Sequence, residues 1–517
     1  MRVVSPHPRG KGIAGPGAGW RERAPMTRWQ WAAKTAAALA MLLAAGATAS
    51  GQTIRVTGST SARYIQLRLF ARDSVPVADA AGTSLLRQLP DGSIVRCIPG
   101  EAYCHQVRAG EVLSTVPVIH DLNLSAWGFG RGLRLNSQIR GRSSFGESTD
   151  LWPRENEHLE VLALYGEMER GDLRLRAGRQ WRVSGLGFYN FDGLAVALRP
   201  RPAMWIEAYG GRSLSRGLNE GRTGSALESI ENLSAPDAGI LFGLQGRYRP
   251  SQRVQLGAVY QMDVRADRAG AYSELAAVDG VLRFTRGTAE GSVEFDLAGR
   301  ALNHASLALR SNPIGNTTYF AEARRYHPYF ELWTIWGAFS PVGFDEGRGG
   351  VTWATRDGRL MVRAEASYRR YGDAETDAPD DFSTSGWGAG SSLNWAPAPD
   401  WRLTGSYRLE SGFGAARWDG HAGIRYDVAN RGYIAAQAVA FQRLYEFRLG
   451  EGTVLGLGGE GAATITERSR AFASIMWYRQ QAGAMSAIDW NQLRASLRVE
   501  WVLGGEPAGR TMAGARP

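Results

Sequence analysis

The 517-residue chain contains few of the residues and runs that mark several large protein classes. It has only two cysteines, Cys97 and Cys104, so it is not a disulfide-rich scaffold. It has no uninterrupted apolar run of about 18 residues, which excludes a helical membrane protein. A hydrophobic content of 44% is too high for a disordered chain. A large globular protein and a β-barrel remain.

Lysine is almost absent, and both lysines lie near the start of the chain. From Met26 the sequence has the form of a secretory signal: Arg28 and Lys34 are basic, residues 35–47 are apolar, and residues 47–49 (Ala-Thr-Ala) offer a cleavage site. We therefore expect residues 26–51 to be a signal peptide. We expect residues 1–25 to precede the true start of translation.

Charge and metal-ligand counts argue against two further functions. Residues 1–49 hold seven of the 60 basic residues and one of the 50 acidic residues, so the remainder has a formal net charge of +4. No concentrated basic patch predicts nucleic-acid binding. Cys97 and Cys104 flank a turn with Pro99 and Gly100, which in an exported protein favours a disulfide. With His105 they offer too few ligands for a metal site, and no cofactor is expected.

Apolar and polar residues alternate strictly over long segments. In residues 253–264 the even-numbered residues are apolar, and the odd-numbered ones are polar or glycine except Val259. Residues 359–369, 401–410 and 492–503 repeat the pattern. A period of two places the two sets on opposite faces of a β-sheet.

A water-soluble β-sandwich also alternates, but three features favour a transmembrane barrel. The alternating segments are ten or more residues long. Tight turns at residues 199–202, 356–359 and 396–399 alternate with long connections at 143–157, 212–237, 328–346 and 371–384. Aromatic residues crowd the expected strand ends, where interfacial girdles belong: Trp127, Phe129, Trp181, Phe191, Trp205 and Trp395.

The last alternating segment carries a resemblance. Residues 492–503, with Leu493, Leu497 and Trp501 on one face, resemble the closing strand of Gram-negative outer-membrane β-barrels. Gly178-Arg179-Gln180 and Phe191-Asp192-Gly193 resemble short sequence segments of porin-like and polysaccharide-export barrels. The resemblance implies an outer-membrane location, insertion by the barrel assembly machinery, and contact with outer-membrane lipid and lipopolysaccharide.

The predicted fold is an all-β, antiparallel, up-and-down transmembrane barrel of about 22 strands, within a range of 18–22. Residues 52–110 would form the first strand and the disulfide-containing loop. The strand is expected near residues 60–72, with Ile65, Leu67 and Leu69 facing lipid. Residues 111–503 would form the barrel, and residues 504–517 a C-terminal tail.

The polar face of such a barrel lines its lumen, and its charges set ion selectivity. The expected lumen residues are Arg253, Arg359, Arg363, Arg402, Arg408, Arg494, Arg498, Glu365, Glu410 and Glu500. Because arginine predominates, the sequence predicts passive diffusion of small hydrophilic solutes with a mild preference for anions. No enzymatic chemistry is expected. Cross-strand ion pairing that merely fills the lumen is the competing interpretation.

Three alternatives remain open from the sequence. The aromatic loop at 325–346, with Phe330, Trp333 and Trp336, could bind a ligand such as a sugar, although self-packing is the simpler explanation. The chain could be a non-conducting receptor or adhesion scaffold. His304 and Ser306 resemble the His-x-Ser segment of outer-membrane phospholipase A, so a lipid hydrolase is a remote third interpretation.

Overall fold

The computed structural model describes residues 53–504, apart from residues 84, 91–93, 130–131, 147–157, 215–238, 265–269, 327–342, 373–383, 413–414, 430, 445–450 and 483–489. The predicted signal peptide therefore lies outside the described residues. So do residues Phe330, Trp333 and Trp336 of the aromatic loop.

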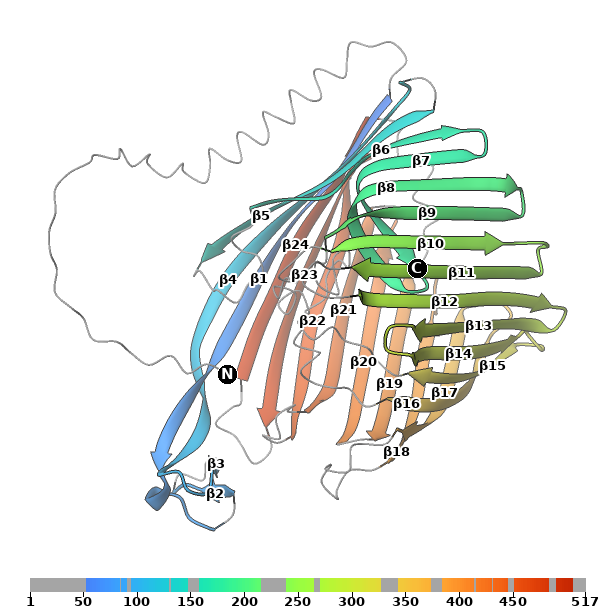
Figure 1. Ribbon diagram of the computed structural model, residues 1–517. Coiled ribbons are helices and arrows are strands. Elements are labelled where there is room, and N and C mark those ends of the chain that lie inside the picture. The colour runs from blue at the N-terminus through green and yellow to red at the C-terminus, as the bar shows by residue number, and fades with distance from the viewer. Residues whose placement is uncertain are drawn as a thin grey trace, which may run out of the picture. The chain divides into compact units, whose positions relative to one another are not determined.

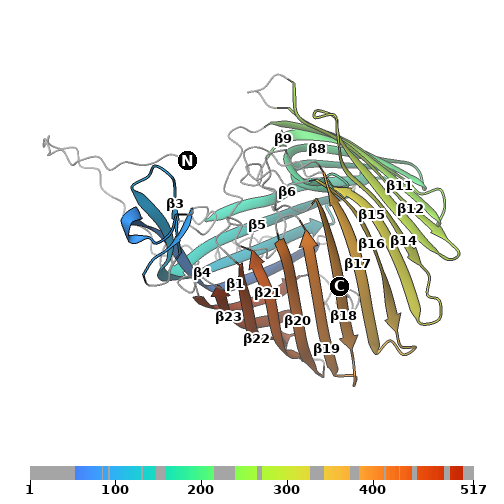
Figure 2. The same ribbon diagram turned by 90° about the horizontal axis from the view of Figure 1, so that it is seen from below.

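The described chain forms a closed antiparallel β-barrel, in which each strand pairs with its sequence neighbours and the last strand pairs with the first (Figures 1 and 2). The prediction of 22 strands is confirmed. The wall consists of β1 (Thr53–Pro76), β4 (Tyr103–Trp127), β5 (Leu133–Gly146), β6 (Leu159–Arg170), β7 (Leu173–Ser184), β8 (Gly187–Arg201), β9 (Met204–Ser213), β10 (Ile240–Tyr248), β11 (Val254–Val264), β12 (Ala271–Phe284), β13 (Gly287–Asp296), β14 (Ala301–Ser311), β15 (Thr317–Tyr326), β16 (Phe344–Ala354), β17 (Leu360–Tyr371), β18 (Ser385–Trp395), β19 (Trp401–Gly412), β20 (Ala415–Val428), β21 (Gly432–Leu444), β22 (Glu451–Thr466), β23 (Ser469–Ala482) and β24 (Trp490–Leu503).

Barrel closure depends on β1, which pairs with β4 along one edge and with β24 along the other. Val56 lies opposite Leu503, and the β1–β24 ladder continues to Ile65 opposite Arg494. An even number of strands brings residues 53 and 503 to the same end of the barrel. Among the described turns at that end, those after β6, β8, β16 and β18 are short, in agreement with the expected turns.

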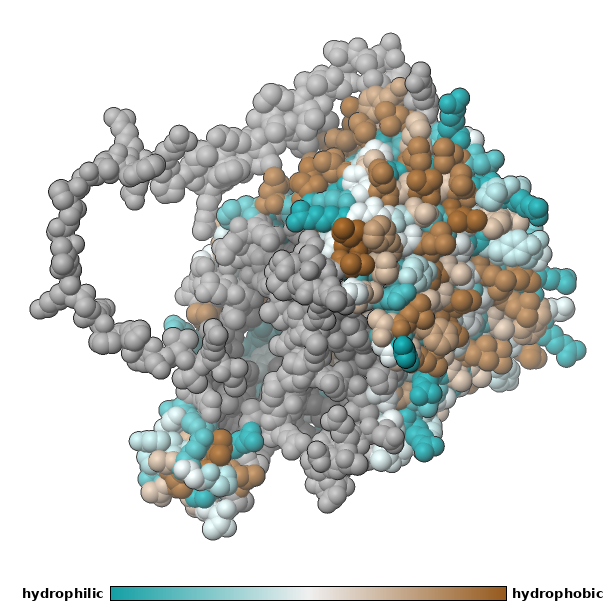
Figure 3. Space-filling view, viewed as in Figure 1, coloured by the Kyte–Doolittle hydropathy of each residue, from teal (hydrophilic) through white to brown (hydrophobic). Residues whose placement is uncertain are grey.

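The two faces of the wall differ as the alternation predicts. Large apolar side chains with half or more of their surface exposed lie on the outer face, among them Leu194, Val278, Leu307, Leu457 and Leu497. Figure 3 shows such side chains spread over the visible outer surface of the wall. Exposed apolar surface of this extent is stable only against another apolar phase. Among the described residues, no helix is both long and apolar enough to cross a bilayer.

A two-stranded ribbon extends beyond the barrel wall. Residues 66–76 of β1 pair with residues 103–114 of β4, whereas β5 joins β4 only from Thr115 onward. Eleven extended residues span about 35 Å. A small cap follows, with a 3-10 turn (Val77–Asp79), β2 (Leu86–Gln88) and β3 (Ile94–Cys97) (Figure 1).

The cap has its own core of buried side chains, namely Ala80, Leu89, Val95, Cys97 and Cys104. The predicted disulfide between Cys97 and Cys104 is present. The expectation that Ile65 faces lipid is wrong, because the register places Ile65 opposite Arg494 and Thr115 on the inner face. The apolar alternation that suggested a lipid-facing strand runs on into the ribbon, beyond the paired wall.

Candidate functional site: the lumen wall

The hairpin of β7 and β8 extends further than the strands on either side of it. The two strands pair to their tip, where Ser184 lies opposite Gly187. However, β6 pairs with β7 only as far as Arg179, and β9 pairs with β8 only from Phe191. Residues 180–190 therefore form a projecting hairpin. Gly187, with φ of 106°, allows the tight turn at its tip.

The projecting hairpin folds into the lumen. Leu186 at its tip is buried in a cluster with Val259 of β11 and Ala277 of β12. The neighbouring residues Leu256 and Val278 have exposed side chains on the outer face, so Val259 and Ala277 belong to the inner face. The hairpin tip thus crosses the inner side of β9 and β10 and rests on β11 and β12.

Aromatic and apolar residues fill the space between the hairpin and the wall. Phe191 is fully buried and stacks on Tyr209 of β9, with ring centroids 5.5 Å apart, and Leu241 of β10 completes the cluster. The Tyr209 hydroxyl donates to Gln261 Oε1 at 2.9 Å. The prediction that Phe191 belongs to an outer aromatic girdle is therefore wrong. Its strand-end position reflects the start of the inward hairpin rather than the membrane surface.

A buried ion pair joins the hairpin to the wall. Arg182 Nε donates to Glu207 Oε1 of β9 at 2.5 Å, and the two side chains are only 6% and 3% exposed. Gln245 of β10 donates to the same carboxylate at 2.9 Å, and Arg182 also donates to Gln180 at 3.0 Å. Because both charges are desolvated, removal of one partner leaves the other uncompensated, at a cost of about 3–5 kcal/mol. The hairpin is held by a specific polar network as well as by apolar packing.

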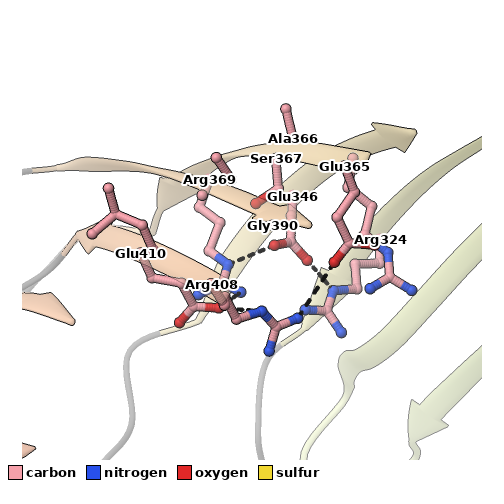
Figure 4. A pocket seen from close by; sticks show the side chains of 13 residues that line it. Arg324, Glu346, Glu365, Ala366, Ser367, Arg369, Gly390, Arg408 and Glu410 are labelled. Atoms are coloured by element: carbon pink, nitrogen blue, oxygen red, sulfur yellow. Dashed lines mark hydrogen bonds and ion pairs between the residues drawn. The ribbon is translucent and has the colours of Figure 1, made fainter. Parts of the chain in front are cut away.

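A second cluster, the ion-paired lattice, covers the inner face of β15–β19. At its centre Glu346 accepts hydrogen bonds from Arg324 and, at 2.7 Å, from Arg369 (Figure 4). Arg369 also reaches Glu410 of β19 at 3.4 Å. Other pairs extend the lattice along the wall, and its members are Arg324, Arg348, Arg363, Arg369, Arg408, Glu322, Glu346, Glu365 and Glu410.

Glycines on β18 make this lattice geometrically possible. The ion pairs of Arg369 with Glu410 and of Arg408 with Glu365 join β17 to β19 and pass over β18. In register on β18 lie Gly388, opposite Ser367 and Glu410, and Gly390, opposite Glu365 and Arg408. A Cβ atom at Gly388 would lie 2.6 Å from Ser367 Oγ, and one at Gly390 would lie 3.3 Å from Glu365 Cγ. Because Gly388 and Gly390 have no side chains, the inner face of β18 leaves space for the long side chains that reach from β17 to β19.

A similar crossing occurs on β22, over residues 456–461. The glycine spacing of this segment matches that of a dinucleotide-binding motif. The Gln437 amide of β21 lies 3.3 Å from Met476 Sδ of β23, with Gly458 between them in register. Glycines of this segment are extended strand residues, with no helix following them in the described chain.

The ten predicted lumen residues fall into three groups. Arg363, Glu365, Arg408 and Glu410 belong to the lattice; Arg363 lies 2.7 Å from Glu365, and Arg408 lies 3.7 Å from both glutamates. Of the other five lattice members, Arg369 follows from the alternation of residues 359–369, whereas Arg324, Arg348, Glu322 and Glu346 are not among the residues predicted from the sequence. The sequence signal for these four residues is a pair of charged residues two positions apart on each of two consecutive strands, β15 and β16, which places both members of a pair on the same face.

The second group lies on β24. Arg498 and Glu500 form an ion pair of 3.2 Å. The Arg498 guanidinium lies 4.5 Å from the centre of the Phe472 ring, and that of Arg494 lies 5.2 Å from the centre of the Tyr478 ring. Cation–π contacts of this kind hold the arginines against the wall.

The third group lies at the end of the barrel that carries the short turns. Arg253 directly precedes β11, Arg402 is the second residue of β19, and Arg359 lies in the turn before β17. In that turn Asp357 accepts a hydrogen bond from the Thr355 hydroxyl at 2.6 Å, which lowers the pKa of its carboxyl, and Arg359 lies 3.5 Å from the same carboxylate.

The hydrolase residues do not form a catalytic pair in the described structure. His304 and Ser306 both lie on the inner face of β14, and Ser306 Oγ is 2.8 Å from Ser292 Oγ of β13. His304 lies opposite Glu294 and Tyr326 in register. Over the residues that the structure describes, no group of three or more histidine, cysteine, aspartate or glutamate side chains is placed to hold a metal ion.

Comparisons with known proteins concern the fold. No protein-family model matches the chain, and no curated protein matches it in sequence. Among solved structures, the chain is similar to the translocation pore of the P pilus usher PapC, with 8% identity, a TM-score of 0.40, and coverage of 86% of this chain and 99% of that one. It is also similar to Acinetobacter baumannii OccAB1, with 7% identity, a TM-score of 0.38, and coverage of 89% and 99%. For Pseudomonas aeruginosa OpdQ the identity is 9%, the TM-score 0.37, and the coverage 87% and 99%.

Proposed function

We propose that this protein is an outer-membrane channel through which small hydrophilic solutes diffuse passively. The observation that carries the proposal is the difference between the two faces of a closed wall. The outer face exposes large apolar side chains, as a lipid-facing surface requires, and the inner face is charged and hydrogen-bonded. An inner face of this polarity is suited to water and dissolved solutes rather than to a dry core.

The width of the barrel supports a passage rather than a filled interior. A wall of 22 strands encloses more space than inward-pointing side chains fill. The inward hairpin, residues 180–190, narrows that space from one side. Counted round the barrel, β18 lies eleven strands from β7, so the hairpin originates opposite the ion-paired lattice. We infer that solutes pass between these two features.

The lattice supports the expected mild preference for anions. It contains five arginines and four glutamates, and β24 adds Arg494 and Arg498 against Glu500. Most of these charges are paired, so the net positive field is small. The preference for anions should therefore be modest and should weaken as the salt concentration rises.

Orientation follows from the connections. We propose that the end with the short turns faces the periplasm, where residue 53 and residue 503 both lie, and that the ribbon and its cap face the cell exterior. The predicted signal peptide at 26–51 would direct export, the barrel assembly machinery would insert the chain, and residues 504–517 would remain as a periplasmic tail. Lipid and lipopolysaccharide would surround the outer face.

The decisive test is the single-channel conductance of the refolded mature protein in a planar bilayer under a salt gradient. We expect discrete conductance steps with a reversal potential that indicates a small excess of anion flow. Folded protein, verified by its heat-modifiable migration on a gel, that produced no conductance steps would contradict the proposal.

One observation favours a second candidate function. The ribbon carries a disulfide-closed cap about 35 Å from the paired wall, and the cap exposes Leu85, Ile98 and Tyr103. A projecting module of this kind suits a surface receptor or adhesin. Under that function, removal of residues 77–102 would abolish binding of a ligand to cells and leave the conductance unchanged.

A further inference from the structure

A row of charged residues crosses the outer face of β7, β8 and β9. Asp192 of β8 lies between Arg179 of β7 and Arg212 of β9 in the strand register. Arg179 binds the Asp192 carboxylate with two hydrogen bonds, of 2.8 and 2.9 Å. We call these three residues the first triplet.

A second triplet with the same order of charges lies on β15, β16 and β17. Asp345 of β16 lies between Arg325 of β15 and Arg370 of β17 in the register. Arg325 Nε is 3.8 Å from Asp345 Oδ1, and both side chains are more than half exposed. The arrangement arginine–aspartate–arginine thus occurs twice, eight strands apart in the wall.

Both triplets face away from the lumen. Leu194, two residues after Asp192, has 62% of its surface exposed, and Tyr368, two residues before Arg370, has 59% exposed. The lattice residue Arg369 points to the opposite face. The triplets are therefore on the surface that contacts lipid.

Both triplets also lie at the same end of the barrel, within two residues of the last wall pair. The β8–β9 ladder ends with Phe191 opposite Ser213, next to the first triplet. The β15–β16 ladder ends with Tyr326 opposite Phe344, next to the second. This is the end that carries the ribbon, which under the proposed function borders the outer leaflet.

We propose that each triplet binds a phosphate group of lipid A, the membrane anchor of lipopolysaccharide, in the outer leaflet. Each triplet has a formal charge of +1, and a guanidinium group binds phosphate oxygens with two parallel hydrogen bonds. This role falls to Arg212 and Arg370, because Arg179 donates to Asp192 and, through Nη1, to the Val161 carbonyl at 2.9 Å. The aspartate holds one arginine in position. Because its strand lies between the strands of the two arginines, the two cations are two strand spacings apart. A charged group at this level of the lipid face requires a partner of opposite charge, and the lipid headgroup is the anion at that depth.

The chain offers a matched control. Arg479 of β23 also lies on the outer face near the same end, and its register partners are Leu455 and Asn491. An outer-face arginine whose side chain only extends toward water should not contribute to lipid A binding, and Arg479 represents that case. The triplets differ from it in having a second arginine across an aspartate.

The experiment measures binding of lipid A to the refolded mature protein in detergent, by native mass spectrometry. The variants are the double substitution R212Q/R370Q, the conservative R212K/R370K and the control R479Q. We expect the native protein and R479Q to bind lipid A equally, R212Q/R370Q to bind at least about tenfold more weakly, and R212K/R370K to recover part of the loss. Lipid A from which both phosphates are removed should bind as weakly to the native protein as lipid A does to R212Q/R370Q.

Two results would overturn the inference: equal binding of lipid A by all variants, or equal binding of lipid A and of a phospholipid with a single phosphate. The inference rests on the proposed outer-membrane function, and the conductance of the same preparations separates the two. Normal conductance without phosphate-dependent binding would reject the triplets as sites and leave the channel in place.

Discussion

Leu186 and Val259 lie 73 residues apart in the chain and pack in one buried cluster, although β9 and β10 stand between their strands in the wall. This contact shows that the β7–β8 hairpin leaves the wall and lies across its inner side. It reduces the cross-section of the lumen by means of two wall strands that extend into it. The hairpin is therefore the structural element on which we expect conductance to depend most strongly.

Substitution of Glu207 by alanine should loosen the hairpin. The change leaves the guanidinium of Arg182 buried without its carboxylate, at a cost of about 3–5 kcal/mol. We expect a larger mean conductance and more frequent fluctuations of the current in single-channel recordings. The control is E290A, which removes an exposed glutamate from the inner face of β13. Current traces of E207A that matched those of the native protein would show that the hairpin does not limit the passage.

The absence of a side chain at Gly388 of β18 should be necessary for the lattice. In G388V, the added side chain would meet Ser367 and displace the arginine and glutamate side chains that cross β18. Overpacking of this kind typically costs about 1–3 kcal/mol in the free energy of unfolding. Urea unfolding in detergent, followed by tryptophan fluorescence, measures the loss. The control G347V adds a side chain where a Cβ atom has no neighbour within 4 Å, and an equal loss in both variants would contradict a specific role for Gly388.

Removal of one lattice charge should shift the selectivity toward permeating ions of the same sign as the charge that is removed. R408Q removes a cation whose side chain is about half exposed to the lumen, so the reversal potential should shift toward cation selectivity. E410Q should shift it the opposite way. Both shifts should shrink at high ionic strength. R479Q, on the outer face, serves as the control, and a shift of similar size in R479Q would disprove the assignment of selectivity to the lattice.

The disulfide should stabilise the cap and leave the barrel unaffected. Cys97 and Cys104 are seven positions apart in the sequence, and closure of so short a loop stabilises the folded state by roughly 2 kcal/mol in the chain-entropy account. In the double variant C97S/C104S, we expect limited proteolysis to cleave within residues 77–102 much faster, with unchanged conductance. Loss of conductance in that variant would mean that the cap takes part in forming the passage.

The barrel itself could be predicted from the sequence because its cause is local. Alternation along a single strand, as in residues 359–369, already separates the lipid-facing set from the lumen-facing set. The charges of Arg363, Glu365, Arg408 and Glu410 could be assigned to the inner face for the same reason. The same alternation rule also applies to the four lattice residues on β15 and β16. The alternating runs of these two strands are shorter, so they indicate the inner face less clearly.

The inward hairpin could not be predicted, because its evidence is non-local. Nothing in residues 180–190 indicates that Leu186 will meet Val259 and Ala277 rather than solvent. The aromatic residues around the turn suggest a membrane-surface girdle equally well, so the sequence predicts the wrong place for Phe191. Likewise, the glycines at 386, 388 and 390 are visible in the sequence. Their role depends on the register that places β17 and β19 on either side of them.

The pairing of β1 with β24 also determines the order in which the molecule can be assembled. Val56 and Leu503 are the partners farthest apart in the chain at the seam, so the wall cannot become continuous before the last strand has been made and delivered. Until then both seam strands carry unsatisfied backbone donors and acceptors, which are costly in a lipid environment. The closing contact is also the one with the greatest loss of chain entropy. Folding should therefore end at this seam, and a partner that shelters the two open edges would determine how fast the barrel forms.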